Sequence, residues 1–195
     1  MGSGCRPLAA LSTMPCIGRP LPDMLVLEAE PHADGRGFFA RVFCRKELAA
    51  LGQEACIDQA NLSYSARRGT LRGLHYQLAP SAETKLVSCL RGTIHDVVLD
   101  LRPGSPTFGR WAAIELSAVN RRMVVVPEGC AHGFLTLEDD CLAFYLVTAP
   151  YDPARERGVR WDDPTFQIVW PFTPGCISDR DASHPDFDPG FHLAA

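Results

Sequence analysis

KLVSCLRGTIHDVVLDL, residues 85–101, contains two short apolar runs that meet at Gly92. Each run has the length of a buried strand and is shorter than most helices in globular proteins. A glycine between two such runs is typical of a turn. The stretch therefore predicts two consecutive β-strands, over residues 85–92 and 93–101.

The same pattern continues on both sides of this stretch. Further strands are predicted at residues 24–30, 37–43, 109–117, 121–127, 132–138 and 141–148. Only residues 44–52 (CRKELAALG) favour a helix, which Gly52 would end. Many strands with almost no helix predict an all-β fold, a sandwich or barrel with one or two short helices.

The composition is that of an ordinary globular protein. Of 195 residues, 46% are apolar and 22% are charged, and the net charge is −4, which gives no indication of nucleic-acid binding. No apolar run has the length of a membrane helix and no secretory signal is evident, so we expect a cytoplasmic protein without a membrane partner. Eight cysteines without a CxxC pair predict buried free thiols.

The length favours one domain, which we place at residues 24–195. Residues 1–23 are interpreted as an N-terminal extension, and the MGSG at its start resembles a tag remnant. After about residue 172 the chain is rich in Pro, Asp, Gly and Ser, which indicates a segment that covers the sheets rather than a second domain.

The motif GTLRGLHYQ, residues 69–77, carries the strongest chemical signal. It contains Arg72 and His75, and Lys85 follows ten residues after the histidine. A neutral imidazole accepts a proton near physiological pH, and two cations in an apolar strand context are costly unless an anion is bound. This combination suits proton abstraction next to a carbonyl group on an anionic substrate.

Seven motifs along the chain resemble the dTDP-4-dehydrorhamnose 3,5-epimerase family. They are RGFF (36–39), QANLSYS (59–65), GTLRGLHYQ (69–77), KLV (85–87), GSPTFGRW (104–111), PEGCAHGF (127–134) and YDPARERGVRWDDP (151–164). The resemblance implies a cupin-type jelly roll, usually dimeric. It also implies epimerisation of a dTDP-4-keto-6-deoxyhexose at the carbons beside the C4 ketone, without metal or organic cofactor.

The resemblance assigns four catalytic roles. His75 is the base, and Asp181, in ISDRDA, is the carboxylate that orients it, with Asp179 as the nearby alternative. Lys85 stabilises the enolate oxygen. Tyr145 is the general acid on the opposite side of the sugar.

The resemblance also predicts the substrate-binding residues. A nucleotide diphosphate suits the guanidinium groups of arginines, and a thymine and a sugar suit an aromatic ring, amides and a second histidine. The candidates are Arg36, Phe39, Gln59, Asn61, Arg72 and His132, and Asp96 is the carboxylate predicted to orient His132.

Three positions depart from the family pattern and leave the inverted carbons open. Arg41 stands where the family commonly has Glu, Leu146 where it has Lys, and Pro150 where it often has the first of two tyrosines. A 3-only or 5-only epimerase therefore remains an alternative. Others are a sugar-nucleotide ketoisomerase, a metal-dependent cupin enzyme and a non-catalytic binding module, although no HxH pair is present for a metal.

Overall fold

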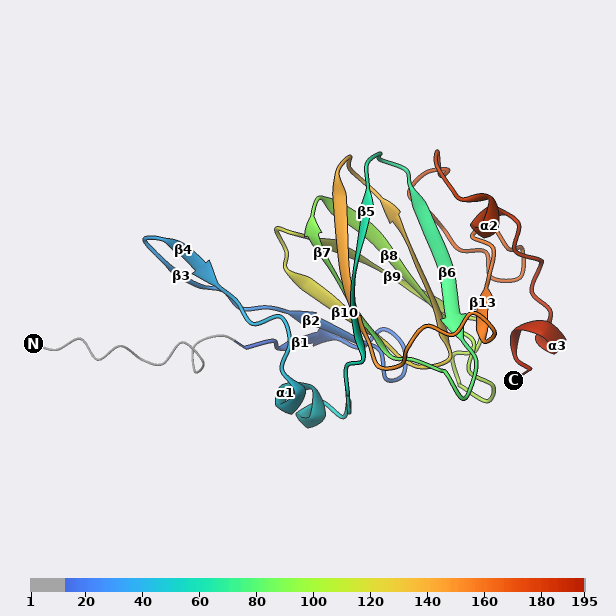
Figure 1. Ribbon diagram of the computed structural model, residues 1–195, viewed down its shortest axis with the longest axis horizontal. Helices are drawn as coiled ribbons and strands as arrows, with labels where there is room; N and C mark the ends of the chain where they lie inside the picture. The colour runs from blue at the N-terminus through green and yellow to red at the C-terminus, as the bar shows by residue number, and fades with distance from the viewer. Residues whose placement is uncertain (1–12, 195) are drawn as a thin grey trace, which may run out of the picture.

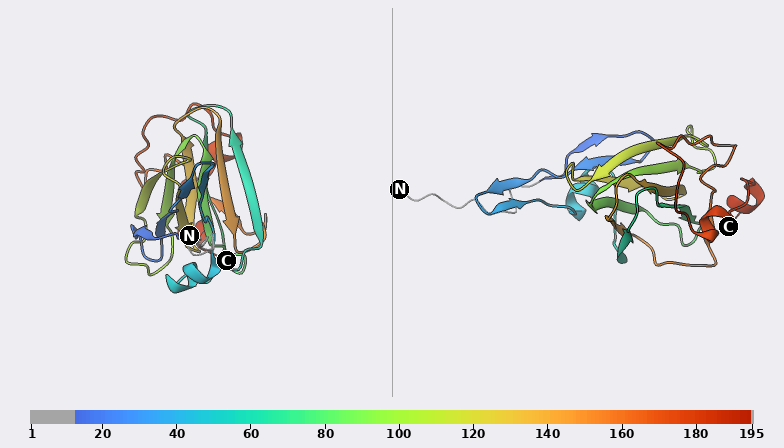
Figure 2. Two further views of the ribbon diagram at one scale, coloured as in Figure 1. Left: turned by 90° about the vertical axis from the view of Figure 1, so that its left-hand side faces the viewer. Right: turned by 90° about the horizontal axis from the view of Figure 1, so that it is seen from above.

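The computed structural model describes residues 13–194, which form two facing antiparallel sheets (Figures 1 and 2). The six-stranded sheet has the order β1 (Cys16–Gly18), β2 (Leu25–Glu28), β10 (Arg122–Val126), β7 (Lys85–Arg91), β12 (Cys141–Val147) and β5 (Gln59–Ser65). The five-stranded sheet has the order β13 (Glu156–Gly158), β6 (Leu71–Gln77), β11 (Cys130–Thr136), β8 (Thr93–Asp100) and β9 (Trp111–Ser117). The predicted all-β sandwich of the cupin jelly-roll type is confirmed.

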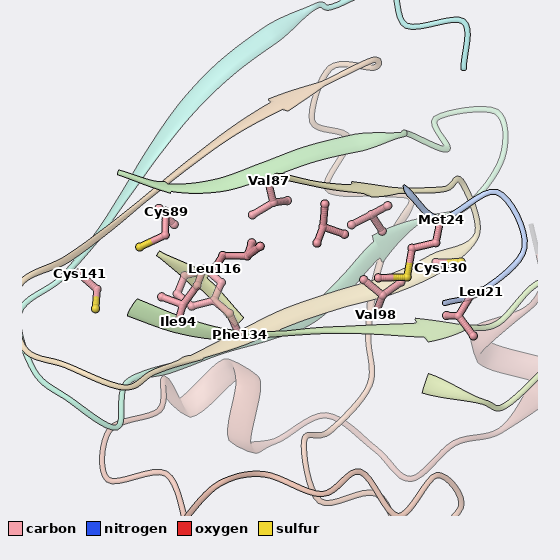
Figure 3. Close-up of a cluster of buried hydrophobic side chains, with 13 residues drawn as sticks. Leu21, Met24, Val87, Cys89, Ile94, Val98, Leu116, Cys130, Phe134 and Cys141 are labelled. Carbon is pink, nitrogen blue, oxygen red and sulfur yellow. The ribbon is translucent and has the colours of Figure 1, made fainter. Parts of the chain in front are cut away.

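Apolar side chains from both sheets fill the space between them. In Figure 3, Val87 and Cys89 of β7 lie across from Ile94 and Val98 of β8, all buried. Side chains alternate between the two faces of a strand, so every second residue of β7 and β8 points into this core.

Residues before Met24 also belong to the domain. β1 pairs with β2, and Leu21 packs into the core between the sheets (Figure 3). The N-terminal extension predicted at residues 1–23 therefore contributes structure from Met14 onward, where Met14 itself is buried. Residues 1–12 and 195 lie outside the described part of the chain.

The C-terminal segment covers the outer face of the five-stranded sheet. Leu74 and Tyr76 of β6 pack there in a second apolar cluster that also contains Phe166, and Phe187 packs against it. Two short helices, α2 (Asp179–Ala182) and α3 (Pro189–His192), lie in this segment (Figure 1). The predicted helix is observed as α1 (Arg45–Ala50), so the described residues contain three short helices rather than one or two.

A hairpin projects from the sandwich. Strands β3 (His32–Asp34) and β4 (Gly37–Phe39) pair with each other alone and extend well beyond the two sheets (Figures 1 and 2). The strand predicted at residues 37–43 is therefore observed only for its first three residues. Phe38 and Phe39, which an apolar pattern would place in a core, are exposed in the single chain.

A β-bulge in β6 shapes one wall of the candidate active site. His132 of β11 pairs with His75 and Phe134 pairs with Arg72, so between these pairs one residue of β11 lies opposite two residues of β6. Gly73 lies in the bulge with φ +100°, and a β-carbon there would be 2.6 Å from the carbonyl oxygen of His132. Glycine is required at this position both for the backbone angle and for the close approach of the strands.

The sequence also predicts that the chain has no membrane-spanning helix and that its cysteines are buried free thiols. Among residues 13–194, no helix is long and apolar enough to cross a membrane. The seven cysteines in this range are free thiols, of which Cys89, Cys130 and Cys141 are buried. Cys56 and Cys176 are exposed, so burial is less complete than the sequence predicts.

Candidate active site

His75 and Asp181 form a hydrogen-bonded pair on the inner side of β6. The His75 Nε2 atom lies 2.8 Å from Asp181 Oδ1, and the other carboxylate oxygen accepts a hydrogen bond from the backbone N–H of Gly73 at 3.2 Å. Asp181 is buried, whereas Asp179 is exposed. Of the two carboxylates left open by the sequence, Asp181 is the one beside the histidine.

The local sequence around Asp181 explains its placement. Ser178 caps helix α2, and its hydroxyl oxygen accepts a hydrogen bond from the Asp181 backbone N–H at 3.1 Å. Such a cap is a common helix start and fixes the orientation of the first turn. The cap fixes the backbone of Asp181, and the bond from Gly73 holds its carboxylate against β6.

The hydrogen bond to Asp181 fixes which ring nitrogen of His75 carries the hydrogen. An ionised carboxylate only accepts hydrogen bonds, so His75 Nε2 carries the hydrogen and Nδ1 keeps the lone pair. Burial is the largest single influence and opposes ionisation of Asp181, but the hydrogen bond and electrostatic attraction of His75, together with the bond from Gly73, outweigh it and lower the pKa of the carboxyl group below its usual value. Asp181 therefore stays charged, and His75 presents a basic nitrogen.

Lys85 begins β7 and forms an ion pair with Glu83. Its Nζ atom lies 3.1 Å from Glu83 Oε1, with only 13% and 9% of the two side chains exposed. The same ammonium donates to the carbonyl oxygen of His75 at 3.3 Å. The sequence pointed to a bound anion as the partner of this buried cation, but in the structure Glu83 supplies the charge.

Arg72 has a different environment. Its guanidinium donates to the Ser65 hydroxyl at 3.1 Å and to the Tyr64 carbonyl at 2.8 Å. Within residues 13–194 it forms no ion pair with a carboxylate, and the residue is exposed. Its positive charge is therefore available to an anion.

Two adjoining hollows form a cavity between the inner faces of the sheets. They have volumes of about 280 and 330 Å³ and share His75, Lys85 and Tyr145 in their walls. The first is also lined by Gln59 and Asn61. The second is also lined by Arg72, His132 and Asp181. Eight of the ten site residues predicted from the sequence are thus brought together by the fold.

Tyr145 enters the cavity from β12. It pairs with Asn61 of β5 on one side and with Val87 of β7 on the other. Burial, reinforced by the negative charge of Glu83, raises the pKa of the Tyr145 hydroxyl above its usual value. The phenol therefore remains protonated at neutral pH and is a neutral proton donor.

A second histidine–carboxylate pair lies next to the first. His132 Nε2 is 2.7 Å from Asp96 Oδ2, and the Asp96 side chain is fully buried. This is the partner predicted for His132, which occupies the position on β11 opposite His75.

Arg36 and Phe39 are not near this cavity in the single chain. Both lie on the projecting β3–β4 hairpin (Figure 1), where they line a separate hollow of about 180 Å³ with His32 and Phe38. Arg36 forms an ion pair with Asp34 in the same hairpin.

Several cavity residues were not identified from the sequence. Gln77, Glu83, Tyr151 and Glu156 line the first hollow, and Arg180 lines the second. Gln77 follows His75 by two residues on one strand, so strand alternation alone would have found it. Glu156 accepts hydrogen bonds from Tyr151 at 2.5 Å and from Arg180, a contact between distant segments that no local pattern reveals.

Tyr151 also bears on the departures from the family pattern. It lines the cavity, so one of the two expected tyrosines is retained there. Leu146 is buried on the other face of β12, and Arg41 pairs with Glu47 at 2.7 Å.

Comparisons with known proteins identify the family of the chain. The family model described as dTDP-4-dehydrorhamnose 3,5-epimerase matches residues 19–189. An enzyme of that name from Sinorhizobium fredii is 44% identical over 164 residues, 84% of either chain. A dTDP-4-dehydrorhamnose 3-epimerase from Streptomyces niveus is 43% identical and is matched over 78% of this chain and 73% of its own.

A solved structure supports the same relationship. The Bacillus anthracis dTDP-4-dehydrorhamnose 3,5-epimerase, with TDP and PPi bound, superposes with a TM-score of 0.87 at 42% identity, covering 90% of this chain and 100% of the other. Sequence, fold and cavity therefore lead to one assignment, and the chain belongs to the dTDP-4-dehydrorhamnose 3,5-epimerase family.

Proposed function

We propose that this protein epimerises a dTDP-4-keto-6-deoxyhexose at C3, C5 or both, by removing and returning a proton next to the C4 ketone. The observation that carries the proposal is the His75–Asp181 pair, which faces Lys85 and Tyr145 across one cavity. The lowered pKa of the Asp181 carboxyl group keeps it ionised and the raised pKa of the Tyr145 hydroxyl keeps it protonated, as the proposed reaction requires.

Proton removal is assigned to His75 Nδ1. A hydrogen on carbon next to a ketone is weakly acidic, so the base must be aligned with it, and such a base typically contributes a factor of about 10²–10⁴ in rate. Asp181 fixes the tautomer and stabilises the imidazolium that forms.

The enolate that results needs a cation or hydrogen-bond donor at its oxygen. Lys85 Nζ is held beside His75 by Glu83 and by the His75 carbonyl, so it is positioned before the substrate arrives. A fixed donor of this kind contributes about 3 kcal/mol to transition-state stabilisation.

Inversion requires a second proton from the opposite face of the sugar. Tyr145 approaches from the six-stranded sheet, whereas His75 approaches from the five-stranded sheet. A protonated phenol on the opposite wall supplies that proton without bringing another charge into the cavity.

A homodimer would complete the nucleotide site. The β3–β4 hairpin carries Arg36 and Phe39 away from the cavity of its own chain and exposes both. In a two-fold dimer, the hairpin of one subunit reaches the other, where an arginine and an aromatic ring suit a diphosphate and a thymine. Arg72, without a carboxylate partner among the described residues, is the second candidate for the diphosphate.

The ketoisomerase alternative uses similar proton transfers but moves the carbonyl group. It has no further support from the cavity, which provides one base and one acid on opposite walls. A cytoplasmic location and catalysis without a cofactor also remain predictions, the first supported by the free thiols among residues 13–194.

Deuterium exchange tests the proposal. The native protein in heavy water should incorporate deuterium at C3, C5 or both of dTDP-4-keto-6-deoxyglucose, as followed by proton NMR, and His75→Ala should abolish incorporation. Binding of dTDP by each protein, measured separately, confirms a folded site. Absence of exchange at both carbons in native protein that binds dTDP would remove the epimerase assignment, and a shifted carbonyl signal would favour the ketoisomerase.

A further inference from the structure

His184 is a partly buried imidazole without a part in the proposed reaction. It follows helix α2, its side chain is 13% exposed, and its Nε2 atom has no hydrogen-bond partner among the described residues. Buried polar atoms are nearly always paired, so an unpaired ring nitrogen requires an explanation.

The position of His184 is fixed by Gly158. A β-carbon at Gly158 would lie 2.0 Å from His184 Nε2, so the imidazole occupies the space that the glycine leaves free. Gly158 of β13 pairs with His75 of β6. This contact places the His184 ring edge-on to the His75 ring, with 5.8 Å between the ring centroids.

Three potential metal ligands meet at this point. Asp181 Oδ1 is 2.8 Å from His75 Nε2 and 3.8 Å from His184 Nε2. One ligand atom from each of the three residues lies within 4.8 Å of the others. Zinc binds imidazole nitrogen at about 2.0 Å and carboxylate oxygen at about 2.1 Å, so a small separation of His75 from Asp181 would admit the ion. Two imidazoles and one carboxylate form a ligand set that suits Zn²⁺ and leaves a fourth position open.

We propose that His75, Asp181 and His184 bind Zn²⁺ or a similar divalent transition-metal ion, and that the ion is a reversible inhibitor and not a cofactor. The orphaned nitrogen of His184 then has a function. The ion reaches the site through the cavity, which His75 and Asp181 line.

Inhibition follows from the tautomer of His75. In the metal-free pair Nε2 carries the hydrogen and Nδ1 is the base. A metal ion binds through the lone pair of Nε2, so the single ring hydrogen leaves Nε2 and Nδ1 takes up a proton from solvent in its place. The nitrogen that should accept the substrate proton becomes a donor. Metal binding itself is independent of the proposed function, whereas its inhibitory effect rests on His75 acting as the base.

Zinc binding is measured first on the native protein without an affinity tag, by competition with a chromogenic chelator and without substrate. His184→Ala should weaken the affinity at least about tenfold, since even indirect supports of metal ligands contribute 10–100-fold. His95→Ala is the matched control, because His95 also has a buried, unpartnered Nε2 but lies outside the three-residue cluster. Cys56→Ser and Cys176→Ser exclude binding by the exposed thiols.

An NMR titration of the native protein keeps the test independent of any variant. Zn²⁺ should shift the imidazole signals of His75 and His184 and leave those of His95 unchanged. Inhibition is then expressed for each protein as the rate of deuterium exchange with Zn²⁺ divided by the rate without it. This ratio should be low for the native protein and for His95→Ala, and near one for His184→Ala. A chelator should restore the exchange rate of the inhibited proteins.

The results separate the two proposals. Zinc that leaves the signals of His75 and His184 unchanged, or equal affinity of the native protein and a folded His184→Ala, would overturn the metal site. Zinc binding at these residues in a protein without exchange activity would uphold the metal site and contradict the proposed function instead.

Discussion

Arg72 and His75 face the same cavity although they are three positions apart on one strand. In a regular strand, residues at this spacing point to opposite sides of the sheet. The bulge at Gly73 inserts one residue and brings both side chains to the inner face. A backbone irregularity therefore brings Arg72, proposed to bind the diphosphate, and His75, the proposed base, into one cavity.

Gly73→Ala should disrupt this arrangement. The new β-carbon would meet the His132 carbonyl at 2.6 Å in a backbone conformation with φ +100°, so we expect a loss of several kcal/mol in the free energy of unfolding. Gly104→Ala is the matched control, because Gly104 has φ +80° and nothing within 4 Å of the new atom. Urea unfolding should show a loss of about 1–2 kcal/mol for the control. Equal losses for the two variants would contradict a role for the close strand contact.

The two aspartates of helix α2 should differ sharply in their effect on activity. Asp181→Asn removes the charge that fixes the His75 tautomer and should slow deuterium exchange by about 10²–10⁴-fold. Asp179→Asn changes an exposed carboxylate two residues away and should leave the rate within about twofold. The rates are compared at saturating substrate. Similar rates for both variants would mean that Asp181 does not fix the tautomer of His75.

Tyr145→Phe should separate proton removal from inversion. His75 still removes a proton and returns a deuteron from the same side, so exchange continues, whereas the inverted product falls by about 10²-fold or more. Proton NMR reports deuterium content and configuration in one experiment. A variant that inverts as fast as the native protein would exclude Tyr145 as the acid.

Removing one member of the Lys85–Glu83 pair should destabilise the protein more than removing both. Glu83→Gln leaves an ammonium with 13% exposure without its carboxylate, which typically costs about 3–5 kcal/mol. The double variant Glu83→Gln/Lys85→Met leaves no uncompensated charge and should recover part of that loss. Urea unfolding of the single and double variants measures the coupling, and strictly additive losses would argue against a buried ion pair.

Asp100 should govern acid stability. Its fully buried carboxylate accepts bonds from Arg102, Ser105 and Thr107, which outweigh the effect of burial and hold its pKa well below its usual range. The folded-state pKa is below the unfolded value of about 3.9, so this stabilisation is present above pH 4 and is lost as the pH falls toward the folded-state pKa. Between about pH 4 and pH 2, the native protein should lose up to about 1.4 kcal/mol per pH unit more than Asp100→Asn. Parallel slopes in urea unfolding across this range would rule out Asp100 as the source.

Local pattern sufficed for the elements with a strong apolar signal. The predicted strands at 85–92 and 93–101 are observed as β7 and β8, and the helix predicted at 44–52 is observed as α1. The strands β5 and β6, of seven residues each, were not predicted. The strands β1, β3 and β13, of three residues each, were missed because so few residues show no recognisable period. Their pairing partners, distant in sequence, decide whether such segments become strands.

The amino-acid sequence by itself determined the all-β class and the motifs of the family, because these depend on residue type and short-range spacing, and it predicted His75 as the base, Lys85 as the cation and Tyr145 as the acid. Only the tertiary structure decided that Asp181 rather than Asp179 meets His75, that Glu83 neutralises Lys85, and that His184 lies beside the pair. It also separated Arg36 and Phe39 from the cavity. These relationships arise where segments far apart in the chain come into contact, and such contacts depend on how the sheets and the C-terminal segment pack rather than on any local pattern.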